Sequence, residues 1–185
     1  AAASAAACSA AAYGVLFSFL GASSYVIITG FGETETAYGT MFAVCMFGSM
    51  SGTFIGARLV ERWGADLLLR LGMALTMAGG IVMTALAWAE IHHALAVFGP
   101  MFFCLMAFAL IFPQSVAGAL QPFPHIAGAA SSFIGFVQQL VGAATGATVA
   151  ALSDNTQTAI AQGILVWSVF GLCVYWLVVR RHRTI

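Results

Sequence analysis

The chain alternates long apolar stretches with short polar breaks. A transmembrane helix needs ~20 mostly apolar residues to cross ~30 Å of hydrocarbon. Six stretches reach that length, at about residues 6–30, 37–59, 67–89, 94–120, 126–152 and 157–179. The pattern therefore predicts six membrane-spanning α-helices. Because the connections are very short, consecutive helices are expected to be antiparallel neighbours in one bundle.

Composition supports this class of protein. The chain is 62% apolar and only 6% charged, whereas roughly a quarter of the residues in a soluble domain are charged. Six spans use most of the 185 residues, so we expect an all-α integral membrane protein in a lipid bilayer, without a soluble domain. The formal net charge is zero, which gives no indication of nucleic-acid binding.

The positive charges predict an orientation. Every fixed positive charge belongs to an arginine, and all of them fall around the second polar break or after the last apolar stretch: Arg58, Arg62, Arg70, Arg180, Arg181 and Arg183. The other breaks carry no arginine. Since positive loops stay in the cytoplasm, both termini are predicted to be cytoplasmic, in a multi-pass plasma membrane. No basic residue precedes the first stretch, so a secretory signal is not expected there.

Cysteine and histidine give no indication of a metal site. Cys8, Cys45, Cys104 and Cys173 occur singly in different spans, as small buried residues do. His92 and His93 follow Glu90 in an outer loop, where solvated side chains are expected. No histidine lies within a span to activate a serine, so we predict no metal, no cofactor and no enzymatic activity.

Two spans are rich in small residues. The second contains Gly48, Gly52 and Gly56, and the fifth contains Gly135, Gly142 and Gly146. Small residues at this spacing let helices in lipid approach closely. The pattern predicts helix packing, and it leaves open whether these spans also slide or rock against a partner.

The fourth span carries large soft side chains and a proline. Phe98, Phe102 and Met106 recur every four residues and share one helix face. Pro113 removes a backbone hydrogen bond and is expected to weaken or kink the helix. Gln138 in the fifth span is costly to leave unpaired in lipid, so we expect it, or its neighbour Gln139, to face the bundle interior or a wet cavity.

The two inner connections resemble motifs of a transporter superfamily. Residues 57–66, read with Gly56, resemble the loop between the second and third helices of a six-helix half in the major facilitator superfamily. Glu61, Arg62 and Gly64 match that pattern, whereas Ala65 and Asp66 replace its trailing bases. The stretch from Phe112 to Ser131 includes Pro122-Phe123-Pro124, which is expected to form a rigid extended link. This stretch resembles the Bcr/CflA-type drug:proton antiporters, including the EmrD branch.

The resemblance covers the whole chain as a C-terminal half. It implies one half of a major-facilitator-type twelve-helix bundle, whose N-terminal six-helix half is the partner of this chain. It also implies multidrug efflux across the bacterial inner membrane by alternating access. The first and fourth spans would line the central cavity, and the second and fifth would pack against the missing half. The proton, as coupling ion, would be carried mainly by acids of that half.

From this resemblance and the spans we predict the functional residues. Small amphiphilic molecules would contact Tyr13, Phe17, Phe98, Phe102, Met106 and Gln138. A cytoplasmic gate would consist of Arg58, Glu61, Arg62 and Gly64, with charge pairs made in one state and broken in the other. Neutralising Glu61 should then lower transport at unchanged membrane levels. The alternative is a stand-alone six-helix membrane protein that acts as a scaffold or a homodimeric carrier.

Overall fold

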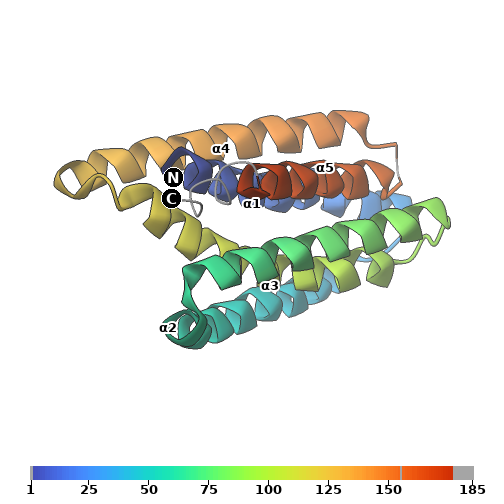
Figure 1. The fold of residues 1–185 in the computed structure, drawn as a ribbon. Helices are drawn as coiled ribbons and strands as arrows, with labels where there is room; N and C mark the ends of the chain where they lie inside the picture. The colour runs from blue at the N-terminus through green and yellow to red at the C-terminus, as the bar shows by residue number, and fades with distance from the viewer. Residues whose placement is uncertain (1, 155, 177–185) are drawn as a thin grey trace.

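The described residues of this computed structural model are 2–154 and 156–176, and they contain helices and short connections without a strand. The helices are α1 (Ala2–Ser24), the π-helical η1 (Tyr25–Gly30), α2 (Glu35–Trp88), α3 (Ala94–Leu120), the 3-10 helix η2 (Pro124–Ile126), α4 (Ala127–Leu152) and α5 (Thr158–Val174) (Figure 1). The predictions made for Arg180, Arg181, Arg183 and residues 177–179 of the last span lie outside the described residues.

The helices have the length and composition of membrane spans. Among the described residues, four helical segments are long and apolar enough to cross a bilayer: Ser4–Gly30, Glu35–Trp88, Ala94–Leu120 and Pro124–Leu152. Helix α5 is also apolar but has 17 residues. The chain is thus a helical membrane protein, as predicted. The predicted spans 37–59 and 67–89 fall almost entirely within α2, on either side of a kink at Gly64.

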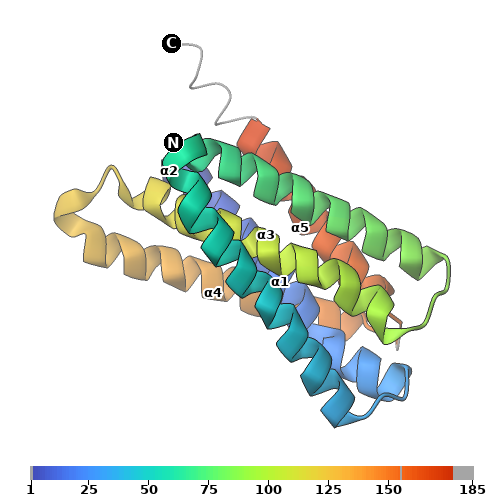
Figure 2. The same ribbon diagram turned by 90° about the horizontal axis from the view of Figure 1, so that it is seen from below.

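Helix α2 is divided at one residue. Gly64 has φ 76° and ψ 161° within a 54-residue helical run, a conformation that glycine adopts without steric cost. The first arm of α2 (residues 35–63) and the second arm (residues 65–88) run in different directions from this point (Figure 2). The predicted loop from Val60 to Asp66 is therefore wrong in its bounds, since a single glycine makes the turn.

Both arms of α2 pack against α3. A Cβ atom added to Gly48 of the first arm would lie 2.6 Å from the carbonyl oxygen of Phe102. One added to Gly79 of the second arm would lie 2.5 Å from the Sγ atom of Cys104. Small residues thus allow both arms to approach the same helix closely.

Helix α1 lies at the centre of the bundle. Its Phe19 ring meets Phe98 of α3 edge-on, with ring centroids 5.6 Å apart. A Cβ atom on its Gly21 would lie 2.5 Å from the carbonyl oxygen of Gly146 in α4, and Gly14 lies under Trp167 of α5. Figure 1 shows α4 along one edge of the bundle and α2 along the other, with α1 and α5 between them.

The connection after α3 differs from the extended link that its prolines predict. Helix α3 continues as one α-helix through Pro113. Gln121, which precedes Pro122, keeps α-helical angles (φ −49°, ψ −40°), and Pro124 begins a 3-10 turn. The expectation of an extended link is therefore wrong. Pro124 at the first position of η2 needs no backbone donor there, and its fixed φ suits the turn.

The predicted packing glycines have different surroundings. Gly48, Gly52 and Gly56 are buried and face α3 or Leu68 within this chain. Gly142 and Gly146 face Phe17 and Gly21 of α1. A Cβ atom added to Gly135 would have nothing within 4 Å. The glycine ladder of the first arm therefore builds an internal contact of this bundle.

Candidate functional site

A drug-sized groove opens between α3 and α4, with the start of α1 at its floor. The two helices diverge from the connection that joins them (Figure 1). The groove has a volume of about 570 Å³ and an apolar lining, made by Ala6, Ala119, Phe123, Ile126, Ala129, Ala130, Phe133 and Ile134. We call it the α3–α4 furrow. Ligand sites of ~300–1,000 Å³ with mostly apolar walls are typical of small-molecule binding.

Four aromatic rings form a cluster on α1 and α3, about two helical turns along α3 from the furrow. The Tyr13 ring lies 5.9 Å from Phe17, 5.8 Å from Phe108 and 5.5 Å from Phe112 between centroids. Phe108 and Phe112 stack at 5.3 Å. All four side chains are half-buried, so their outer faces are available for stacking with a flat ligand.

The structure separates the predicted substrate contacts into different surroundings. Tyr13 and Phe17 belong to the aromatic cluster. Phe98 is 3% exposed and packs instead against Phe19 and Tyr38. The backbone of Phe102 and Met106 lies against Gly48 and Gly52 of the first arm of α2. The six predicted side chains do not line one surface, and their contact with a drug stays a prediction.

Gln138 lies in the contact between α4 and α1. It is 4% exposed, and its Nε2 donates a 2.9 Å hydrogen bond to the Oγ of Ser9. The Ser9 hydroxyl in turn donates to the carbonyl of Ala6 at 2.7 Å. This chain of hydrogen bonds gives the Nε2 group of the amide a partner, and without one the group would be costly to bury. It also ties α4 to α1 beside the furrow.

The predicted gate residues lie around the turn between the arms of α2. Arg58, Glu61, Arg62 and Gly64 are all exposed. Charged side chains at such positions interact weakly with one another in water. Their role as a gate therefore stays a prediction that depends on a partner surface.

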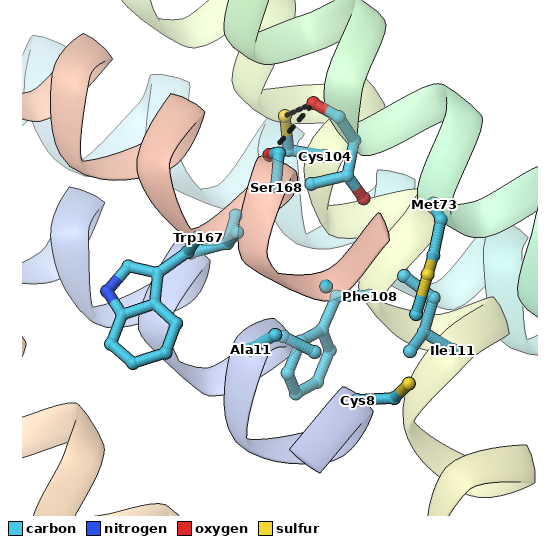
Figure 3. A pocket seen from close by; sticks show the side chains of 12 residues that line it. Cys8, Ala11, Met73, Cys104, Phe108, Ile111, Trp167 and Ser168 are labelled. Atoms are coloured by element: carbon cyan, nitrogen blue, oxygen red, sulfur yellow. Dashed lines mark hydrogen bonds between the residues drawn. The ribbon is translucent and has the colours of Figure 1, made fainter. Parts of the chain in front are cut away.

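An interior cavity lies between α1, α3, α5 and the second arm of α2 (Figure 3). Its volume is about 20 Å³. Cys104 and Ser168 on its wall approach the carbonyl oxygen of Thr76, at 3.9 Å and 3.5 Å (Figure 3). Such a volume holds about one water molecule, so a drug-sized ligand does not fit there.

At the end of the bundle opposite the Gly64 turn, polar contacts connect the loops between helices. Gln157 is buried, and its Nε2 donates to the carbonyl of Ile91 at 3.1 Å. The Thr156 hydroxyl donates to Asp154 at 2.6 Å and lowers the pKa of that carboxyl. His93 Nδ1 accepts from the backbone N–H of Leu95 and thereby caps α3. Among the described residues, no three His, Cys, Asp or Glu side chains gather to hold a metal ion.

Sequence reasoning missed Phe108, Phe112 and Ser9. The two phenylalanines are four residues apart, like the predicted stripe of Phe98, Phe102 and Met106, and lie on another face of the same helix. The sequence marks both faces as aromatic. It does not say which face meets α1, because that depends on how α3 is rotated in the bundle.

Known proteins similar to this chain are named for drug resistance. A bicyclomycin resistance protein homolog of Haemophilus influenzae is 27% identical over 170 residues, covering 92% of this chain and 42% of that protein. A chloramphenicol resistance protein of Pseudomonas aeruginosa is 24% identical over 121 residues, covering 65% of this chain and 29% of that protein. The chain thus spans less than half the length of these relatives. No family model and no solved structure matches it.

Proposed function

We propose that this chain is the C-terminal six-helix half of a drug exporter of the major facilitator type, close to the Bcr/CflA group. The observation that carries the proposal is the similarity over 92% of the chain to a bicyclomycin resistance protein homolog. The α3–α4 furrow and the aromatic cluster add a surface with the size and apolar character that such a substrate requires.

The furrow favours uncharged or weakly polar amphiphiles. Its lining contains no ionisable side chain, so a full charge would enter it without a partner and at a high cost in free energy. In the separate aromatic cluster, a flat ring would stack on Tyr13 or Phe17. Chloramphenicol, for which one relative is named, combines a flat ring with polar groups and suits this surface.

Transport would proceed by alternating access. The furrow and the aromatic cluster supply one wall of a central cavity, and an N-terminal six-helix half of the same polypeptide supplies the other. Glu61 and Arg62 would pair with that half at the cytoplasmic side in one state and separate in the other. Because the spans of this chain offer no acid at mid-depth, proton coupling would rest on the other half.

Drug accumulation in bacteria tests this proposal. The complete polypeptide, expressed in a drug-sensitive strain, is expected to lower the steady-state content of radiolabelled chloramphenicol. Tyr13→Ala should slow efflux about tenfold, since ~1.4 kcal/mol of ring stacking corresponds to that factor. Ile81→Ala, at an exposed position of the second arm of α2, is the matched control. Accumulation that the wild-type protein does not lower would contradict the proposal.

The alternative of a stand-alone six-helix scaffold or homodimeric carrier predicts a different native mass. An antibody against residues Arg180–Ile185 would detect a polypeptide about twice the 19.2 kDa of this chain if the chain is half of an exporter. A band at 19.2 kDa would favour the alternative.

A further inference from the structure

We propose that Arg70 and Tyr175 form a binding site for the phosphate of an anionic phospholipid at the arginine-bearing end of the bundle. This inference is independent of the proposed transport function. It rests on the place of Arg70 on the membrane-facing surface, on the way Tyr175 holds its guanidinium, and on the balance of charge around it.

Arg70 lies on an apolar stripe of the second arm of α2. Its side chain is exposed, as are those of Leu67 and Leu71 on the same helix face. These apolar neighbours face outward from the bundle, toward the surroundings that lipid occupies around a membrane helix. A guanidinium on such a face is costly unless it reaches the interface, where water or an anionic headgroup can bind it.

The depth of Arg70 suits the headgroup region. It follows the turn at Gly64 by six residues, which is about 9 Å along the helix axis. Side chains of an α-helix tilt toward the helix N-terminus, so the long Arg70 side chain extends back toward the turn and the membrane surface. The exposed indoles of Trp63 and Trp176 are typical of the same interfacial depth.

Tyr175 fixes the orientation of the guanidinium. The Tyr175 ring is 7% exposed and packs in an apolar cluster with Leu69, Met73 and Ile111. The Nε–H of Arg70 donates a 2.6 Å hydrogen bond to the Tyr175 hydroxyl, and the guanidinium carbon lies 5.8 Å from the ring centroid. The Tyr175 hydroxyl thus contacts the Nε edge of the guanidinium. The two terminal nitrogens form another edge, which can bind a phosphate through paired hydrogen bonds.

The charge balance at this end favours an anionic partner. Around the turn the sequence has three arginines, Arg58, Arg62 and Arg70, and two carboxylates, Glu61 and Asp66. Asp66 lies one turn before Arg70, favours its positive charge and competes with a lipid for it. The net charge of these five side chains is nevertheless positive. Basic clusters at this depth attract anionic headgroups.

Native mass spectrometry of the complete polypeptide tests the site. The purified protein is titrated in detergent with dioleoyl phosphatidylglycerol or dioleoyl phosphatidylcholine, and the fraction that retains lipid is measured. We expect preferential retention of phosphatidylglycerol, reduced about fivefold by Arg70→Gln. Arg70→Lys should reduce it less, because the charge stays while the paired hydrogen bonds are lost. Tyr175→Phe should also weaken retention without changing any charge.

Arg58→Gln is the matched control, since it removes an exposed arginine from the same end and should leave retention within about twofold. Equal losses for Arg58→Gln and Arg70→Gln would show general charge attraction and overturn the site. Unchanged retention in Arg70→Gln would overturn it as well. If inorganic phosphate displaces the lipid, the site binds free anions and the lipid assignment is wrong. If the melting temperature shows that Arg70→Gln does not fold, Arg70→Lys and Tyr175→Phe are used to test the site instead.

Discussion

Helices α3 and α4 are consecutive apolar helices of similar length with opposite surroundings. In the most apolar part of α3, 61% of the residues are buried within the chain, whereas in that of the Pro124–Leu152 segment only 11% are buried. Helix α3 is covered by both arms of α2 and by α1, and α4 meets α1 along one narrow stripe. Most apolar side chains of α3 therefore pack within the bundle, whereas most of those of α4 point away from the rest of this chain.

The same difference appears in their exposed side chains. Phe133, Phe136 and Leu140 of α4 are each more than half exposed. A soluble protein rarely leaves so large an apolar face uncovered. In a membrane protein, lipid or a further part of the protein covers it. The proposed N-terminal half would cover this face of α4 and close the furrow.

The largest difference in stability between the two regions is expected when a glycine in each is replaced by valine. A Cβ atom at Gly52 would collide with the carbonyl oxygen of Met106, whereas one at Gly135 would meet nothing within 4 Å. Gly52→Val should destabilise the protein by about 2–3 kcal/mol, as overpacking does, and Gly135→Val by much less. Melting temperatures in detergent check this. Equal losses at both positions would mean that α2 and α3 are not as closely packed as described.

A smaller effect is expected where α4 is tied to α1. Gln138→Leu removes the hydrogen bond to Ser9, and such bonds in membrane proteins contribute ~0.6 kcal/mol on average. Gln139→Leu, at the exposed neighbouring position, is the matched control and should change the melting temperature little. A double-mutant cycle with Ser9→Ala measures the coupling directly. A coupling near zero would show that α4 does not depend on this bond.

The sequence predicts the class and the order of helices well, because hydropathy and chain length decide what crosses a membrane. It places the turn near Gly64 but makes it too long, since one glycine at positive φ replaces several loop residues. It does not predict how each helix is rotated. The sequence pattern puts Phe98 at a ligand surface, yet its ring lies in the core beside Phe19, whereas Phe108 and Phe112 meet Tyr13. Rotation depends on contacts between distant segments, which periodicity alone does not encode.

Protection of a cysteine by drug tests the central claim that substrate binds in the α3–α4 furrow. Ala129 lines the furrow, and Ala78 lines an apolar groove of about 450 Å³ between the second arm of α2 and α3; both are exposed. Ala129→Cys and Ala78→Cys would each be made in the complete polypeptide, with exposed Cys173 replaced by Ser. We predict that chloramphenicol slows labelling by a maleimide at position 129 and leaves the rate at position 78 unchanged. Equal protection at both positions, or none at 129, would contradict the account.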